Sequence, residues 1–235
     1  MMRRSMNMWL PHLGLTQKDR LIILNYQGVS IPIIDAAQHI LRNQFHVEGL
    51  QPAKLGAAGS FTPVSGPSLQ IHPDMDDKHF FVSCFRDGQV QIADSDRWRL
   101  TPSGSRQLQD LYQDVVPKDL LKNLNILNVE QQRPDSGNCG LYSVANAVEF
   151  LCTGDFPRRR FKQRKLRQHL IQCLDDGEFT PFPKRSRHNN QRKLIPAVDS
   201  SSLDTGKTSP IPESRKRKCP DENGNNKRGK LDEAI

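Results

Sequence analysis

Cys139 stands at a position where a thiol nucleophile could be activated. It lies in Ser136-Gly-Asn-Cys-Gly140, where a polar loop meets an apolar segment with helical spacing. A helix N-terminus carries a partial positive charge and free backbone N–H groups. These favour a thiolate and can bind a developing oxyanion, and Gly140 would leave room for a substrate backbone. From these residues alone, an ordinary small residue in a helix cap is an equally good interpretation.

A thiol nucleophile also needs a general base and a group that orients it, usually a histidine and a carboxylate. His79 begins an aromatic run that predicts a strand, and Asp94 follows a second, alternating run. Asp87-Gly88 between them predicts a hairpin turn. Asp94 would then lie diagonal to His79 on one face, with Asp96 directly opposite as a rival. A surface histidine beside an unrelated aspartate is the alternative.

The loop before Cys139 could supply a further group, a side-chain amide that completes an oxyanion hole. Gln131 and Gln132 both lie there.

The chain has five cysteines, an odd number without CxxC spacing. This argues against a zinc site or a disulfide framework and fits a reducing compartment. We therefore expect no metal and no cofactor.

The elements that must position these residues follow from the spacing of apolar side chains. Pro32 can open a helix that continues to Phe45, and residues 140–151 predict a helix that Gly154 ends. The remaining expected elements are a helix capped by Thr16, helices within 105–124 and 161–174, and strands at 69–72, 79–85, 89–93 and 125–129. Residues 52–67, rich in small residues and proline, predict a loop.

Charge and polarity divide the chain into two parts. Residues 184–235 carry 13 Lys or Arg and 7 Asp or Glu, a net charge of +6, and lack apolar periodicity. We expect a folded domain over residues 1–183 and a disordered basic tail over 184–235. Basic clusters at 184–187 and 215–218 indicate nuclear localisation signals or a weak, salt-dependent contact with nucleic acid. A merely solvated tail is the alternative.

The composition also limits the compartment and the partners. No apolar run approaches the roughly 20 residues that span a bilayer, and the N-terminus lacks the apolar core of a signal peptide. We expect a soluble, intracellular and nuclear protein that is monomeric and has no membrane partner.

The order His, Asp, Gln and Cys-Gly, with a helix after the cysteine, resembles the ubiquitin-like-protein proteases, which include the SUMO/sentrin-specific proteases and the adenovirus protease. The resemblance is closest to a subgroup found in metazoan genomes beside mobile elements. It covers about residues 8–183, and the matching stretches are residues 9–16, 33–38, 49–51, 79–83, 92–95, 131–132, 138–142, 166–170 and 179–183.

The resemblance implies an α+β fold of the papain-like clan, with a central mixed sheet flanked by helices. It implies a cysteine-type peptidase with Cys139 as nucleophile, His79 as general base and Asp94 as its orienting carboxylate. Gln132, or alternatively Gln131, would be the oxyanion donor. The partner and substrate would be a ubiquitin-like modifier such as SUMO or NEDD8, cleaved after its C-terminal Gly-Gly.

Four positions depart from the family pattern. Phe80 replaces a tryptophan, Asn138 replaces an aspartate, the loop from Gln132 to Cys139 is one residue longer, and residues 29–32 replace Trp-Leu-Asn-Asp. We expect Phe80, Asn138 and Gly140 to contact the substrate. Two other functions stay open. One is a catalytically weak or inactive module that binds a ubiquitin-like protein, and the other is a mobile-element product that contacts nucleic acid through the tail.

Overall fold

The computed structural model describes residues 7–96, 98–116, 124–134, 136–157 and 160–186. The chain divides into two units, residues 1–188 and 189–235, and every described residue belongs to the first. Most of the predicted basic tail therefore lies outside the described residues, together with the nuclear-signal and nucleic-acid predictions attached to it. The nuclear localisation stays a prediction.

The described unit is built around a mixed five-stranded sheet with the order β3-β4-β5-β6-β7. Its strands are Glu48–Gly49, Ser68–Asp74, His79–Arg86, Gln89–Ala93 and Asn125–Leu127. β4, β5 and β6 are antiparallel, whereas β3 and β7 pair in parallel at the two edges. Val82 pairs with Ala93, which is the register predicted from a turn at Asp87-Gly88.

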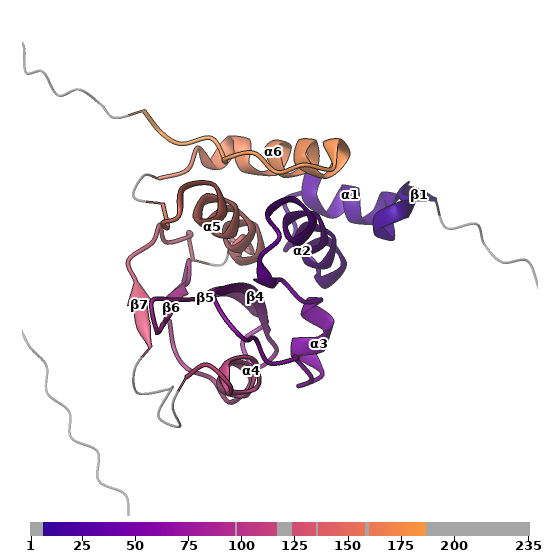
Figure 1. The fold of residues 1–235 in the computed structure, drawn as a ribbon. Coiled ribbons are helices and arrows are strands. Elements are labelled where there is room, and N and C mark those ends of the chain that lie inside the picture. The colour runs from indigo at the N-terminus through magenta and orange to yellow at the C-terminus, as the bar shows by residue number, and fades with distance from the viewer. Residues whose placement is uncertain (1–6, 97, 117–123, 135, 158–159, 187–235) are drawn as a thin grey trace, which may run out of the picture. The chain divides into compact units, whose positions relative to one another are not determined.

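Helices cover both faces of the sheet (Figure 1). α2, Ile31–Phe45, and α5, Cys139–Thr153, lie on one face, and α6, Gln163–Asp176, lies outside α5. α4, Pro102–Tyr112, lies on the other face. Successive side chains of β5 point to opposite faces of the sheet. Phe80 and Val82 therefore pack in the core under α2 and α5, and Phe81 packs in the smaller core under α4.

Local signals explain several helix boundaries. Thr16 and Asp19 form a reciprocal capping box at the start of α1, Gln17–Leu24, as the sequence suggested. Two expectations were wrong in detail. Residues 52–67 are not all loop, because Ala53–Ala57 form the short helix α3. The helix expected within 105–124 begins earlier, at Pro102, where Thr101 caps it, and ends at Tyr112.

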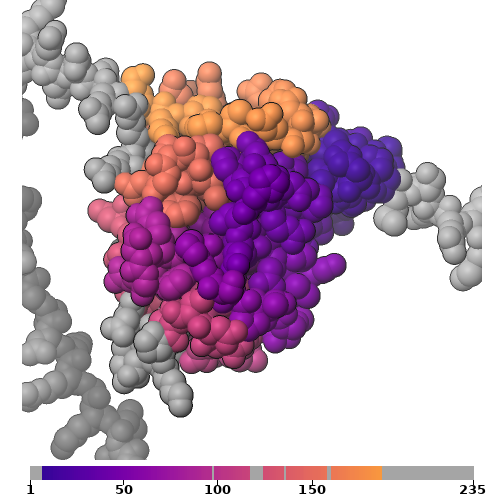
Figure 2. Space-filling model, viewed as in Figure 1, coloured from indigo at the N-terminus to yellow at the C-terminus, as the bar shows by residue number. Residues whose placement is uncertain are grey.

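The N-terminal segment of the described chain lies against α6. β1, Met8–Leu10, pairs with β2, Leu15–Thr16, around the 3-10 helix Pro11–Leu13. The indole N–H of Trp9 donates to the carboxylate of Asp175 in α6 at 2.7 Å. In Figure 2 the indigo N-terminal segment lies beside the orange segment near the C-terminal end of the described chain. The N-terminal segment thereby holds α6 in place.

The contacts of the folded part continue beyond Pro183. Phe161 and Lys184 form an isolated bridge, and the backbone N–H of Arg185 donates to the carbonyl of Arg160 at 2.8 Å. Lys184 also pairs with the carboxylate of Glu149. The expected boundary between residues 183 and 184 stays a prediction, with two further residues hydrogen-bonded to the domain. Among the described helices, none is long and apolar enough to cross a membrane.

Candidate active site

His79, Asp94 and Cys139 come together at one end of the sheet. His79 is the first residue of β5, Asp94 directly follows β6, and Cys139 is the first residue of α5. His79 Nε2 lies 2.6 Å from Asp94 Oδ1. The thiol of Cys139 lies near enough to act on the same imidazole. Because Asp94 uses Nε2, Nδ1 is the ring nitrogen that remains for the thiol.

The carboxylate of Asp94 is firmly held. Its side chain is only 4% exposed, and its Oδ1 also accepts the backbone N–H of Asp96 at 2.8 Å. Asp96 therefore supports the carboxylate that contacts His79 and does not replace it. The β5–β6 ladder ends at Val82 and Ala93, so the chain beyond β6 is free to turn and place Asp94 against the ring.

This environment favours the charged form of His79. Burial by itself lowers the pKa of the ring, but the hydrogen bonds with Asp94 and Cys139 and the negative charge of both partners outweigh it. Together they raise the pKa of His79 to about 10. The imidazole is therefore protonated at neutral pH. An imidazolium beside a cysteine favours the nucleophilic thiolate.

The other described cysteines lack such a partner. Burial raises the pKa of Cys84 to about 12, and it also raises the pKa values of Cys152 and Cys173. Cys139 is half-buried at a helix N-terminus, where the amides of the first turn have no acceptor within the helix. Among the described cysteines, Cys139 is thus the one placed for nucleophilic attack. The described residues contain no cluster of metal-ligating side chains.

The two glutamines of the preceding loop have different contacts. The amide of Gln131 donates to the carbonyls of Asp94 and Val129, at 3.0 and 3.3 Å, and so fixes the end of β6. The amide of Gln132 lies at the limit of hydrogen bonding from Asp96 Oδ2, at 3.5 Å, and its own oxygen accepts from Ser136. Gln132 is the less constrained of the two. Its role as oxyanion donor stays a prediction.

Asn138 connects the start of α5 to α6. Its Oδ1 accepts from the guanidinium of Arg167 at 2.5 Å, and Arg167 also donates to the carbonyls of Ile23 and Gln27. Arg167 is 7% exposed. Sequence reasoning missed this arginine, and no local signal marks it, because its partners lie 29 to 144 residues away in the chain. Asn138 therefore positions the loop that carries Cys139.

Gly140 is packed against the core beside the nucleophile. A methyl group at its Cα would lie 3.1 Å from Val29, 3.2 Å from the ring of Phe80 and 3.4 Å from Ile34. Phe80 is 9% exposed and belongs to the main core. Both residues thus have packing roles that the sequence did not reveal, and their expected contacts with substrate stay predictions.

A cavity of about 460 Å³ opens beside His79. Asp77 lies in its wall together with Arg99, which pairs with it through two hydrogen bonds of 2.5 and 2.6 Å. Trp98 lies there too and packs edge-on against Phe81 at 4.9 Å between ring centroids. His79 and Asp94 border this cavity, so the base is accessible from that side.

Comparison with known proteins relates this arrangement to a fold. No family model and no curated protein matches the sequence. The structure is similar to the C-terminal Ulp1 protease domain in complex with Smt3, the yeast ortholog of SUMO, with a TM-score of 0.52 and 10% identity over 75% of this chain and 90% of that domain. The SUMO protease Ulp1 with its catalytic cysteine oxidised to a sulfenic acid gives a TM-score of 0.53, 12% identity, and coverage of 74% and 90%.

The chain therefore has the fold of the Ulp1 protease domain, with a mixed five-stranded sheet flanked by helices. This confirms the α+β fold expected from the sequence. Identity of 10% to 12% shows the fold alone. The relation to the mobile-element subgroup stays a prediction.

Proposed function

We propose that this protein is a cysteine-type peptidase that cleaves after the C-terminal Gly-Gly of a ubiquitin-like modifier such as SUMO or NEDD8. The observation that carries the proposal is the contact of His79 with both Asp94 and Cys139 at the N-terminus of α5. A solved protein with the same fold, the Ulp1 protease domain, is described in complex with Smt3. The monomeric state is part of the same proposal.

The proposed reaction uses each group in a defined step. The thiolate of Cys139 attacks the carbonyl carbon of the terminal glycine, and the oxyanion is held by the backbone N–H of Cys139 and by the amide of Gln132. The imidazolium of His79 then gives its proton to the leaving amine, which leaves a thioester on Cys139. Neutral His79 takes a proton from water, the hydroxide attacks the thioester, and the carboxylate product is released. Asp94 keeps the ring oriented throughout.

A panel of electrophilic probes tests the proposal directly. SUMO, NEDD8 and ubiquitin, each carrying a C-terminal vinyl sulfone, are incubated with the full chain, and covalent adducts are located by mass spectrometry. We expect one modifier to form a thioether with Cys139, and Cys139→Ala to abolish the adduct. Cys152→Ala is the matched control, because Cys152 is exposed but its thiol pKa is raised. Equal labelling of wild type and Cys139→Ala would refute the proposal.

A non-catalytic module that binds a ubiquitin-like protein is the second candidate. The contacts of the two glutamines favour it, because both side-chain amides already have acceptors other than an oxyanion. The amide of Gln131 donates to backbone carbonyls, and the side chain of Gln132 contacts Asp96 and Ser136. On this alternative, unmodified SUMO or NEDD8 binds wild type and Cys139→Ala with equal affinity, and wild type forms no adduct with any probe. Adduct formation at Cys139 excludes it.

A further inference from the structure

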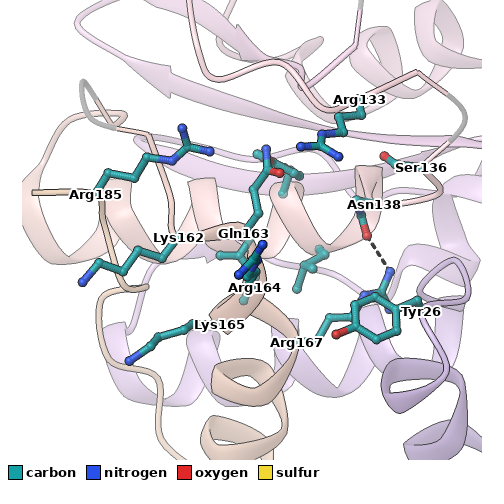
Figure 3. A pocket seen from close by; sticks show the side chains of 13 residues that line it. Tyr26, Arg133, Ser136, Asn138, Lys162, Gln163, Arg164, Lys165, Arg167 and Arg185 are labelled. Carbon is teal, nitrogen blue, oxygen red and sulfur yellow. Dashed lines mark hydrogen bonds between the residues drawn. The ribbon is translucent and has the colours of Figure 1, made fainter.

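A second cavity, here called the basic pocket, lies between the loop before Cys139 and the start of α6 (Figure 3). It has a volume of about 800 Å³, within the range typical of small-molecule sites. Among the described residues, the cavity is lined by no carboxylate and by six basic side chains: Arg133, Lys162, Arg164, Lys165, Arg167 and Arg185.

The described residues around the basic pocket offset only part of its positive charge. Among the described residues, none of the six side chains forms a salt bridge. The neighbouring carboxylate of Glu130 accepts from the backbone N–H of Phe161 and from the amide of Gln163, and it can offset at most one of the six positive charges. Like charges that gather in a concave site raise the local concentration of a ligand of opposite charge.

Arg167 shows the imbalance most clearly. Its guanidinium is almost fully buried, yet the three oxygens that accept its hydrogen bonds are the neutral ones of Ile23, Gln27 and Asn138. Burial lowers the pKa of this arginine. A buried cation is costly without an opposite charge nearby. An anion in the basic pocket would supply that charge.

Two guanidinium groups of the basic pocket, those of Arg133 and Arg185, lie around the side chain of Gln163 (Figure 3). In Figure 3, Arg133 and Arg185 lie on opposite sides of Gln163. The amide of Gln163 donates to the hydroxyl of Tyr142 at 2.9 Å, and the positive charges of Arg133 and Arg185 both act on that hydroxyl. Planar guanidinium groups that converge from two segments suit the oxygens of phosphate groups.

The side chains that line the basic pocket favour a compact ligand over a nucleic-acid strand. Binding of single strands relies on aromatic faces on which bases stack. Only one exposed aromatic ring lines the described part of the basic pocket, that of Tyr26, which is 72% exposed and carries the guanidinium of Arg167 over one face, at 5.3 Å from its centroid. Tyr142 is buried, and its hydroxyl is bonded to Gln163. The basic pocket thus offers charge and hydrogen-bond donors but, among its described residues, a single exposed ring, too few for the successive bases of a strand to stack on.

We propose that the basic pocket binds a small ligand that carries several closely spaced phosphates. An inositol polyphosphate and a nucleoside polyphosphate share this chemistry. The ligand would contact Ser136 and Asn138, which lie three residues and one residue before Cys139. It would bind whether or not Cys139 is catalytic, so this inference stands apart from the proposed function.

Calorimetric titration of the full chain tests the inference, with inositol hexakisphosphate, inorganic tripolyphosphate and ATP as separate probes at about 150 mM salt, where long-range attraction is screened. We expect saturable binding of at least one probe. The double variant Arg133→Gln/Arg185→Gln should weaken it by about tenfold or more, because two charge-assisted hydrogen-bond donors are lost. Stronger binding of inositol hexakisphosphate than of tripolyphosphate would indicate that the ligand carries its phosphates on a ring. Stronger binding of tripolyphosphate would indicate a linear phosphate chain, as in a nucleotide.

Arg42→Gln/Arg106→Gln is the matched control, since both arginines are exposed, lie on other helices and form no ion pair with a described residue. It removes the same charge and retains the basic tail, so its affinity should stay within about twofold of wild type. Lys165→Gln gives a second, single-residue test. Equal weakening in both double variants, or no saturable binding of any probe, would overturn the inference. Binding of a mixed-sequence oligonucleotide that depends on Arg133 and Arg185, without binding of the small probes, would overturn it too.

Discussion

Replacement of Asp94 by asparagine isolates the charge of the carboxylate that faces His79. The asparagine keeps the shape of the side chain and one acceptor oxygen, so the backbone N–H of Asp96 and the ring of His79 retain a partner. What disappears is the negative charge. A hydrogen bond to a charged partner contributes about 1.5–3 kcal/mol, which equals about 1–2 pKa units at about 1.36 kcal/mol per unit.

We therefore expect the pKa of His79, which is raised to about 10 in the wild type, to fall by about 1–2 units or more in Asp94→Asn. A titration of the His79 ring protons by NMR measures this shift. The rate of Cys139 alkylation by iodoacetamide at neutral pH should fall by about tenfold or more, because the imidazolium that favours the thiolate is weakened. Cys139→Ala supplies the background from the other cysteines.

Asp96→Asn is the control for this prediction, because Asp96 contacts Asp94 through its backbone N–H, which the substitution keeps, and its side chain contacts Gln132. Its effect on the His79 titration should be the smaller of the two. A His79 pKa that stays within about half a unit of wild type in Asp94→Asn would refute the account. A larger shift in Asp96→Asn than in Asp94→Asn would identify Asp96 as the orienting carboxylate instead.

Three further predictions follow from other contacts. Burial lowers the pKa of His72 to about 3, so the unfolded state takes up a proton on this side chain before the folded state does as the pH falls. The free energy of unfolding should therefore drop by about 3 kcal/mol between pH 6.5 and 4. Urea titrations of His72→Gln should show a smaller drop. Asn138→Asp places a carboxylate on the buried guanidinium of Arg167 and should raise the free energy of unfolding by about 1 kcal/mol; an unchanged urea midpoint would contradict this. Gln132→Ala should lower the turnover of a modifier precursor by about 10²–10³-fold. Gln131→Ala should chiefly lower the free energy of unfolding, by about 1 kcal/mol. Similar losses of turnover in both variants would count against Gln132 as the oxyanion donor.

The hairpin and the start of the helix after Cys139 could be predicted because their signals are local. Asp87-Gly88 requires a tight turn, and this turn fixes the pairing of Val82 with Ala93 and hence which residues share a face with His79. That register left both Asp94 and Asp96 within reach of His79, and the turn of the chain after β6 is what places Asp94 against the ring. α3 was missed because a five-residue helix has too few turns to produce a periodic pattern.

The sequence by itself determined the identity and order of the candidate catalytic groups, because side-chain chemistry and short-range spacing are properties of the chain. Only the tertiary structure decided that Cys139 and His79, 60 residues apart in the sequence, lie near enough to interact. It also decided that Gln131 is committed to the backbone of Asp94. The basic pocket and the burial of Arg167 depend on contacts between α1, α5 and α6. Such long-range contacts arise from how whole elements pack, and no local pattern encodes them.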